Sequence, residues 1–343
     1  MFYLLDLLTG ILECGWIAYG TVHGMPLWQI LSFPLAYHIG NLFPFPFSVG
    51  KKVIAFLSAV PACIGIIMMT GITYESCRFW LICTALASGS AVLQTVRSSH
   101  KSRSSRLLKR LFRVGGFFLA PSAAVIPEIL LILTSVIIIP AAVKYEGKPG
   151  ICGIHGQKGF SAVMIFHQLH YFFYAHTVLA AVSLAFYENI GFGGIAAAAG
   201  LFCCTWITYM SVEPVVSRLT SRLTAVFWTG HISICIILAA MSFIRSLPLF
   251  TVLWIITGFG GGTVYTISAL AEKYGAYNKN DMTVSENLGH TLGLLTAVAV
   301  SALSNENTAP HIVLIFASIS ALLAAFALYQ IRRGQHEGYG KSR

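Results

Sequence analysis

The sequence predicts an all-α polytopic membrane protein with about 12 transmembrane helices, or about 11 in the alternative interpretation. Only 10% of its 343 residues are charged, against about a quarter in soluble domains. Its mean hydropathy of +0.76 indicates more apolar surface than a single soluble core can hide. Apolar residues also gather in stretches of about 20, the length that crosses the hydrocarbon layer of a membrane.

The N-terminal part is expected to hold six spans. The first stretch, "MFYLLDLLTGILECGWIAYG", is apolar from its start and lacks the basic region and cleavage site of a signal peptide, so we expect a retained first span. We expect the block at 105–145 to cross the membrane twice, with a tight turn at Pro127 and Glu128 between two compact helices. A single crossing is the alternative. The six expected spans lie near 3–21, 26–46, 53–72, 79–96, 105–126 and 128–144.

The C-terminal part is expected to repeat this plan after a hydrophilic link. The sequence therefore divides into an N-terminal half at 1–145, a cytoplasmic linker at 146–160, a C-terminal half at 161–332 and a cytoplasmic tail at 333–343. The glycines of "GFGGG" at 258–262 indicate close helix packing, because no strand precedes them as in a dinucleotide site. The six further spans lie near 161–186, 192–211, 224–244, 249–270, 284–304 and 310–331.

The placement of basic residues favours twelve spans with both termini in the cytoplasm. In that arrangement every Lys and Arg except Arg78 and Arg245 falls in or beside a cytoplasmic loop, as the positive-inside rule requires. With eleven spans, the basic residues in part of one half would lie on the outer side of the membrane, against this rule. The net charge of +10 is then a property of these loops. The basic run at 97–113 is expected to touch anionic lipid headgroups, and no nucleic-acid partner is predicted.

This layout resembles the major facilitator superfamily of secondary transporters. The stretch "GNLFPFPFSVGKK" supplies Gly40, Gly50 and a basic pair between helices two and three, although it lacks the aspartate of that family's loop signature. The second-half loop "SVEPVVSRLTSR" retains Glu213, Arg218 and Arg222 between helices eight and nine. The stretches "GFGGGTVYTISALAE" and "SENLGHTLGLL" look like helices ten and eleven of such proteins. The resemblance implies two halves that rock about a central site. We expect it in the cytoplasmic membrane of a prokaryote, since no lipidation or retention signal is present.

One polar stripe stands out in the stretch "FHQLHYFFYAH" at 166–176. Its residues His167, His170, Tyr171 and Tyr174 fall within about 100° of arc on one helix face, whereas His176 points the opposite way. The resemblance makes this the seventh helix, which is expected to line the central cavity. We therefore predict substrate binding by these four side chains, with hydrogen bonds between neighbouring helices as the alternative.

A second candidate site lies on the first span. Glu13 is in the middle of this span, and Asp6 lies on the same face near the membrane interface. Because burial in a membrane disfavours the charged form of a carboxyl group, such a residue can take up and release protons at physiological pH. We predict that Glu13 couples transport to protons. Glu286 and His290, spaced i, i+4, are expected to form a structural pair.

Two other classes of protein remain as alternatives. An integral-membrane enzyme would need an acidic metal-binding pair, a nucleophile elbow or a nucleotide loop, and the sequence contains none of them. The eight cysteines form no CxxC motif, so neither a disulfide framework nor a thiolate zinc site is expected. We predict a non-enzyme without a cofactor that handles protons and a small, amphipathic organic solute. A metal or haem protein would use ligands from the set His38, His167, His170, His231 and His290.

Overall fold

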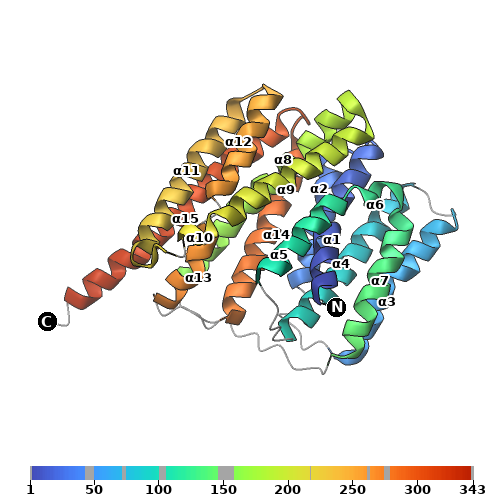
Figure 1. The fold of residues 1–343 in the computed structure, drawn as a ribbon, viewed down its shortest axis with the longest axis horizontal. Helices are drawn as coiled ribbons and strands as arrows, with labels where there is room; N and C mark the ends of the chain where they lie inside the picture. Colours follow the sequence, from blue (N-terminus) through green and yellow to red (C-terminus); the bar gives the residue numbers. More distant parts are fainter. Residues whose placement is uncertain are drawn as a thin grey trace. The chain divides into compact units, whose positions relative to one another are not determined.

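A computed structural model shows the fold of residues 2–42, 50–71, 75–99, 106–145, 158–216, 218–260, 263–273 and 279–340 (Figure 1). Within these ranges the chain is α-helical, with one short 3-10 turn and no strand. The helices form two compact units. Unit 1 comprises Met1–Cys152 and Leu179–Cys203, and unit 2 comprises Gly153–Val178 and Cys204–Arg343.

Seven helices of unit 1 follow one another along the chain. Their bounds agree with the expected spans, although the expected ends at residues 46 and 72 and the expected start at residue 105 lie outside the described residues. Gly24, with φ of +60°, allows the tight turn between the first two helices because its backbone is in the left-handed region. The helices are α1 (Phe2–Val22), α2 (Leu27–Leu42), α3 (Lys51–Met69), α4 (Glu75–Ser99), α5 (Arg106–Leu119), α6 (Ser122–Val125) and α7 (Pro127–Val143).

The apolar block at 105–145 is two segments and not one. Helix α5 ends at Leu119, α6 adds a single turn, and α7 begins at Pro127. The residue before this proline, Ile126, has non-helical angles of φ −135° and ψ 52°. This is the expected effect of proline, whose ring disfavours a helical conformation in the preceding residue. The sequence-based division at Pro127 is therefore confirmed.

Glycine brings α1 and α5 into close contact. A Cβ atom on Gly10 would overlap the carbonyl oxygen of Arg113, and one on Gly116 would overlap the carbonyl oxygen of Leu7. Gly10 lies beside Gly116, and Gly15, further along α1, lies beside Ala120 just after the end of α5. Later residues of α1 thus contact later residues of the second segment, so the two helices run parallel. Small residues allow helix backbones to approach in this way within a membrane, where packing replaces the hydrophobic effect as the driving force.

Unit 2 is built mainly from helices that follow the predicted linker. Helix α15 continues to Gly340 and so includes most of the stretch that we predicted as a tail. The span predicted at 249–270 contains two helices: the first ends at Gly260 and the second begins at Thr263. The elements are α8 (Lys158–Ile190) and α9 (Phe192–Ser211), which both units share, then α10 (Glu213–Val216), η1 (Thr220–Arg222), α11 (Leu223–Phe243), α12 (Leu247–Gly260), α13 (Thr263–Lys273), α14 (Lys279–Leu303) and α15 (Ala309–Gly340).

The core of unit 2 lies where α11 packs against α13 and α15. Phe160, Val163, Phe227, Leu270 and Leu328 are buried together there. Glycine again permits close approach in this unit, as the sequence indicated for Gly258. A Cβ atom on that residue would overlap the carbonyl oxygen of Thr205 in α9.

The surface of the helices identifies the solvent as lipid. Large apolar side chains such as Phe56, Trp80, Ile236 and Phe243 are exposed along them, which is typical of lipid-facing positions. Six helices are long and apolar enough to cross a membrane: Lys51–Met69, Cys77–Val96, Phe160–Ile190, Phe192–Val216, Leu223–Phe243 and Ala309–Arg333. With the shorter apolar helices Pro127–Val143 and Leu247–Gly260, they confirm the predicted all-α, multi-pass membrane fold.

Candidate functional site

An acid–base cluster lies in the interior of unit 1. It consists of Glu13 from α1, His38 from α2 and Arg113 from α5. The side chain of Glu13 is only 2% exposed, and Nη2 of Arg113 donates a hydrogen bond to its Oε2 atom in an ion pair. The other carboxylate oxygen, Oε1, lies 3.9 Å from Nε2 of His38. The carboxylate is thus held between a fixed cation and a group that can itself gain a proton.

The sequence of α5 explains how a cation reaches the inside of unit 1. Its basic residues Arg106, Lys109, Arg110 and Arg113 follow the i, i+3, i+4, i+7 spacing of one helix face. Lys109, Arg110 and Arg113 are half-buried, whereas the leucines and the phenylalanine between them are exposed. The helix therefore turns its charges inward and its apolar side outward, the reverse of a helix on a soluble protein. The exposed residues are Leu107, Leu108, Leu111 and Phe112.

Arg113 is a member of the acid–base cluster that sequence analysis missed. We counted it only among the basic residues of the cytoplasmic side. The structure pairs it with Glu13, exactly 100 positions earlier in the chain. The one-sided basic spacing of α5 was the signal that could have found it, because a charged helix face next to a membrane span needs a partner or a water-filled cavity.

A second group, the histidine cluster, lies in the interior of unit 2. It consists of His167 and His170 from α8 and His231 from α11, and all three side chains are buried. Their ring centroids form a nearly equilateral triangle with sides of 5.3 Å, 5.1 Å and 5.2 Å. One nitrogen from each ring lies within 4.8 Å of the other two. The predicted stripe therefore gains a third imidazole from another helix.

Hydrogen bonds orient part of this cluster. Nδ1 of His231 lies 2.8 Å from the carbonyl oxygen of Phe227, to which it donates its proton. This leaves Nε2 of His231 as an acceptor, and Nδ1 of His167 donates to it at 3.0 Å. Among the described residues, Nε2 of His167 and Nδ1 of His170 have no hydrogen-bond partner although both are buried. Each such unsatisfied group costs about 1–3 kcal/mol.

The two tyrosines of the predicted stripe lie beside the histidine cluster. The ring of Tyr174 is buried and stacks at 6.5 Å from that of His170. Tyr171 is half-buried and meets Tyr174 edge-on at 5.5 Å. The four stripe residues therefore form one continuous polar and aromatic strip on α8, and their role in binding stays a prediction.

The pair predicted on α14 has a different principal partner. Nε2 of His290 lies 2.9 Å from Oε1 of Gln168 in α8 and 4.0 Å from Oε1 of Glu286. Because the hydrogen bond to Gln168 is buried and the carboxylate of Glu286 is 45% exposed, the link between α14 and α8 is the stronger contact.

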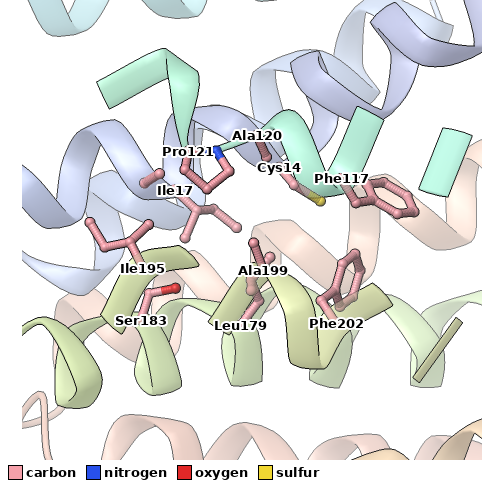
Figure 2. A pocket seen from close by; sticks show the side chains of 11 residues that line it. Cys14, Ile17, Phe117, Ala120, Pro121, Leu179, Ser183, Ile195, Ala199 and Phe202 are labelled. Carbon is pink, nitrogen blue, oxygen red and sulfur yellow. The ribbon is translucent and has the colours of Figure 1, made fainter. Parts of the chain in front are cut away.

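Two cavities occur in unit 1. The first has a volume of about 10 Å³, which is room for one water molecule and not for a solute. Figure 2 shows Cys14, Ile17 and Phe117 on one side of it and Ile195 and Phe202 on the other. The second encloses about 320 Å³ beside the turn between α1 and α2 and the start of α4, a volume within the range of small-molecule sites. Its polar and aromatic lining includes Tyr19, His23, Trp28, Arg78 and Trp80.

Comparison with known proteins relates this fold to membrane transporters. No family model and no curated protein sequence matches the chain. Among solved structures, the nucleoside transporter NupG superposes with a TM-score of 0.60 at 14% identity, covering 96% of this chain and 98% of that one. The human organic anion transporter MFSD10 (TETRAN) gives a TM-score of 0.55 at 13% identity, covering 92% of this chain and 83% of that one.

Both of these structures are of transporters. The likeness extends over nearly the whole chain, so it covers both units and not a single helix bundle. The chain therefore shares the fold of these two transporter structures.

Proposed function

We propose that the protein is a secondary active transporter that moves a small organic solute across the cytoplasmic membrane of a prokaryote by alternating access, with both termini in the cytoplasm. The observation that carries this proposal is the buried acid–base cluster inside a transporter fold. An ionisable group within a membrane is costly, so its presence marks a site that works with ions or protons. The neighbouring structures carry nucleosides and organic anions by their names, and these two classes of solute are the first to test.

Glu13 is the proton-coupling residue in this proposal. Its carboxylate can hold either a proton or the ion pair with Arg113, because protonation removes the negative charge that attracts the guanidinium. Uptake of a proton therefore loosens the contact between α1 and α5, and release of the proton restores it. His38, 3.9 Å away, is placed to pass a proton to or from Oε1 of Glu13.

The stripe on α8 is the solute contact. His167, His170, Tyr171 and Tyr174 offer ring faces together with hydrogen-bond donors and acceptors. Such a surface suits a solute that is aromatic or apolar in one part and polar in another. This is why we propose an amphipathic organic solute and not a bare inorganic anion.

The test is solute-dependent proton movement in proteoliposomes that contain the full chain. A panel of nucleosides and organic anions is applied to the wild type, to Glu13→Gln and to Glu286→Gln. The last variant is the matched control, because it removes a carboxylate of the same size that is 45% exposed. We expect proton flux that requires a solute, disappears in Glu13→Gln and survives in Glu286→Gln.

Two results would contradict the proposal at different levels. Proton-coupled flux that survives Glu13→Gln would remove Glu13 from its role and leave the transporter assignment intact. Solute flux that never responds to a proton gradient would remove proton coupling altogether. For the solute contact, Tyr174→Phe deletes one buried hydroxyl, and an unchanged KM in that variant would argue against the stripe.

A further inference from the structure

The histidine cluster has a feature that solute binding does not require, which is that one nitrogen from each of three imidazoles lies within 4.8 Å of the other two. Two come from consecutive turns of α8, at His167 and His170, and the third comes from His231 on α11. Their side chains are between 0% and 2% exposed. Three buried imidazoles that meet at a point are the arrangement that late first-row metal ions prefer among nitrogen ligands.

The distances are close to those of a metal site. Tetrahedral Zn–N bonds of about 2.0–2.1 Å place neighbouring ligand nitrogens about 3.4 Å apart. Nδ1 of His167 and Nε2 of His231 are 3.0 Å apart, and all three ligand atoms lie within 4.8 Å of one another. Small rotations of side chains about their Cα–Cβ bonds bring such atoms to the required spacing. Metal binding would replace the proton that His167 and His231 now share.

The surroundings of His231 prepare it to bind a metal. Ligating histidines usually donate their second ring N–H to a carbonyl or carboxylate, which fixes the tautomer and aims the other nitrogen at the metal. Nδ1 of His231 makes this bond to the carbonyl oxygen of Phe227 at 2.8 Å. Its Nε2 atom therefore carries no proton and faces Nδ1 of His167 at 3.0 Å.

The unsatisfied nitrogens point to the same conclusion. Within the described part of the chain, Nδ1 of His170 and Nε2 of His167 are buried without a hydrogen bond. A purely structural network would be expected to satisfy its members, since buried polar atoms in proteins nearly always have partners. A bound ion would give the ring of His170 a partner, whereas on His167 it would bind Nδ1 and leave Nε2 as it is.

We propose that His167, His170 and His231 bind one divalent transition-metal ion, with Zn²⁺ as the ion that best matches three imidazoles and a fourth position open to water. The three ligands are neutral, so the ion keeps its charge and would polarise whatever occupies the fourth position. The site shares His167 and His170 with the proposed solute contact, but its test does not depend on transport, because it measures metal content and not flux. It differs from the cofactor-free protein that the sequence predicted.

The test measures the metal content of the purified full chain. The protein is produced with Zn²⁺ in the medium and isolated through an affinity tag that contains no histidine, because the buried site is best filled during folding. Wild type, His167→Gln, His170→Gln and His231→Gln are compared with His311→Gln, a control in the same unit that removes a half-buried imidazole outside the cluster. We expect about one zinc per chain in wild type and control, and almost none in the three variants.

A measurement on the wild type alone guards against variants that fail to fold. X-ray absorption at the zinc edge is expected to show imidazole nitrogens at about 2.0–2.1 Å and no sulfur. Three outcomes would overturn the proposal: wild-type protein that holds no more zinc than the cluster variants, zinc lost equally in His311→Gln, or a spectrum without imidazole scattering. Because no solute is needed, a failure here is separate from any failure of the transport assay.

Discussion

The two buried polar clusters differ in how they accommodate ionisable side chains in the interior of a helical unit. Unit 1 places a full negative charge, Glu13, in its interior and neutralises it with Arg113. Unit 2 places three imidazoles together without a carboxylate among the ligand atoms of the cluster. The carboxylate of Glu13 has a charged partner in its own unit, whereas two nitrogens of the histidine cluster have no hydrogen-bond partner among the described residues. This difference underlies our two proposals, that the first cluster responds to protons and that the second binds a metal ion.

The largest effect is expected from breaking the ion pair of unit 1. Arg113→Ala leaves Glu13 buried with an uncompensated charge, and we expect it to lower the free energy of unfolding by about 3 kcal/mol. The estimate is at the low end for a buried pair because the side chain of Arg113 is 30% exposed. Unfolding of the protein in mixed micelles by a denaturing detergent measures the loss.

The control for this prediction is a second substitution. Arg113→Ala combined with Glu13→Gln removes both charges, and most of the lost stability should return. If the double variant is as unstable as the single one, the loss comes from packing of the arginine stem and not from an unpaired carboxylate.

A smaller effect is expected from the contact that brings this pair together. Gly116→Ala inserts a methyl group against the carbonyl of Leu7, and overpacking of this kind costs about 1–3 kcal/mol. Gly200→Ala is the matched control, because a Cβ atom there meets nothing within 4 Å. That control should be neutral or stabilise by up to about 1 kcal/mol, since alanine is the better helix former. Equal effects at both positions would contradict the close α1–α5 packing.

Next in size is the link between α8 and α14 in unit 2. Gln168→Leu removes the acceptor for Nε2 of His290 and is expected to cost about 1–2 kcal/mol, measured by the same detergent titration. No change would show that the histidine finds another partner.

The smallest effect is expected for the exposed carboxylate. Glu286→Gln should change stability by less than about 0.5 kcal/mol, because its oxygen is 4.0 Å from Nε2 of His290 and the side chain faces solvent or headgroups. A loss comparable with that of Gln168→Leu would reverse our ranking of the two partners of His290.

Sequence analysis predicted those features that depend on local rules. The break before Pro127 follows from the conformations that proline allows in its neighbour, and the interior position of Glu13 follows from its place in an apolar span. Which residues share the polar face of α8 follows from helical periodicity alone. The division into two six-helix halves and the orientation of the termini stay predictions.

The partners of these residues could not be predicted in the same way. Arg113 is 100 positions from Glu13, and His231 is 64 positions from His167. Such pairings depend on which helices pack together and at what rotation, and the spacing of residues within one helix carries no information about either. His231 entered the sequence analysis only as one of five dispersed histidines. Its importance is visible only when α11 lies against α8.

The reversed amphipathic character of α5 has a consequence for how the protein is made. An Arg or Lys at the centre of a membrane helix costs about 2.5–3.5 kcal/mol on insertion scales. Helix α5 carries four basic residues in its first eight, and the last of them, Arg113, lies near the middle of the helix. Such a segment enters the bilayer poorly by itself. We expect the insertion machinery to hold α5 until it meets α1, whose acid offsets one of those charges. The final seating of the first helix would then await a segment synthesised about 100 residues later.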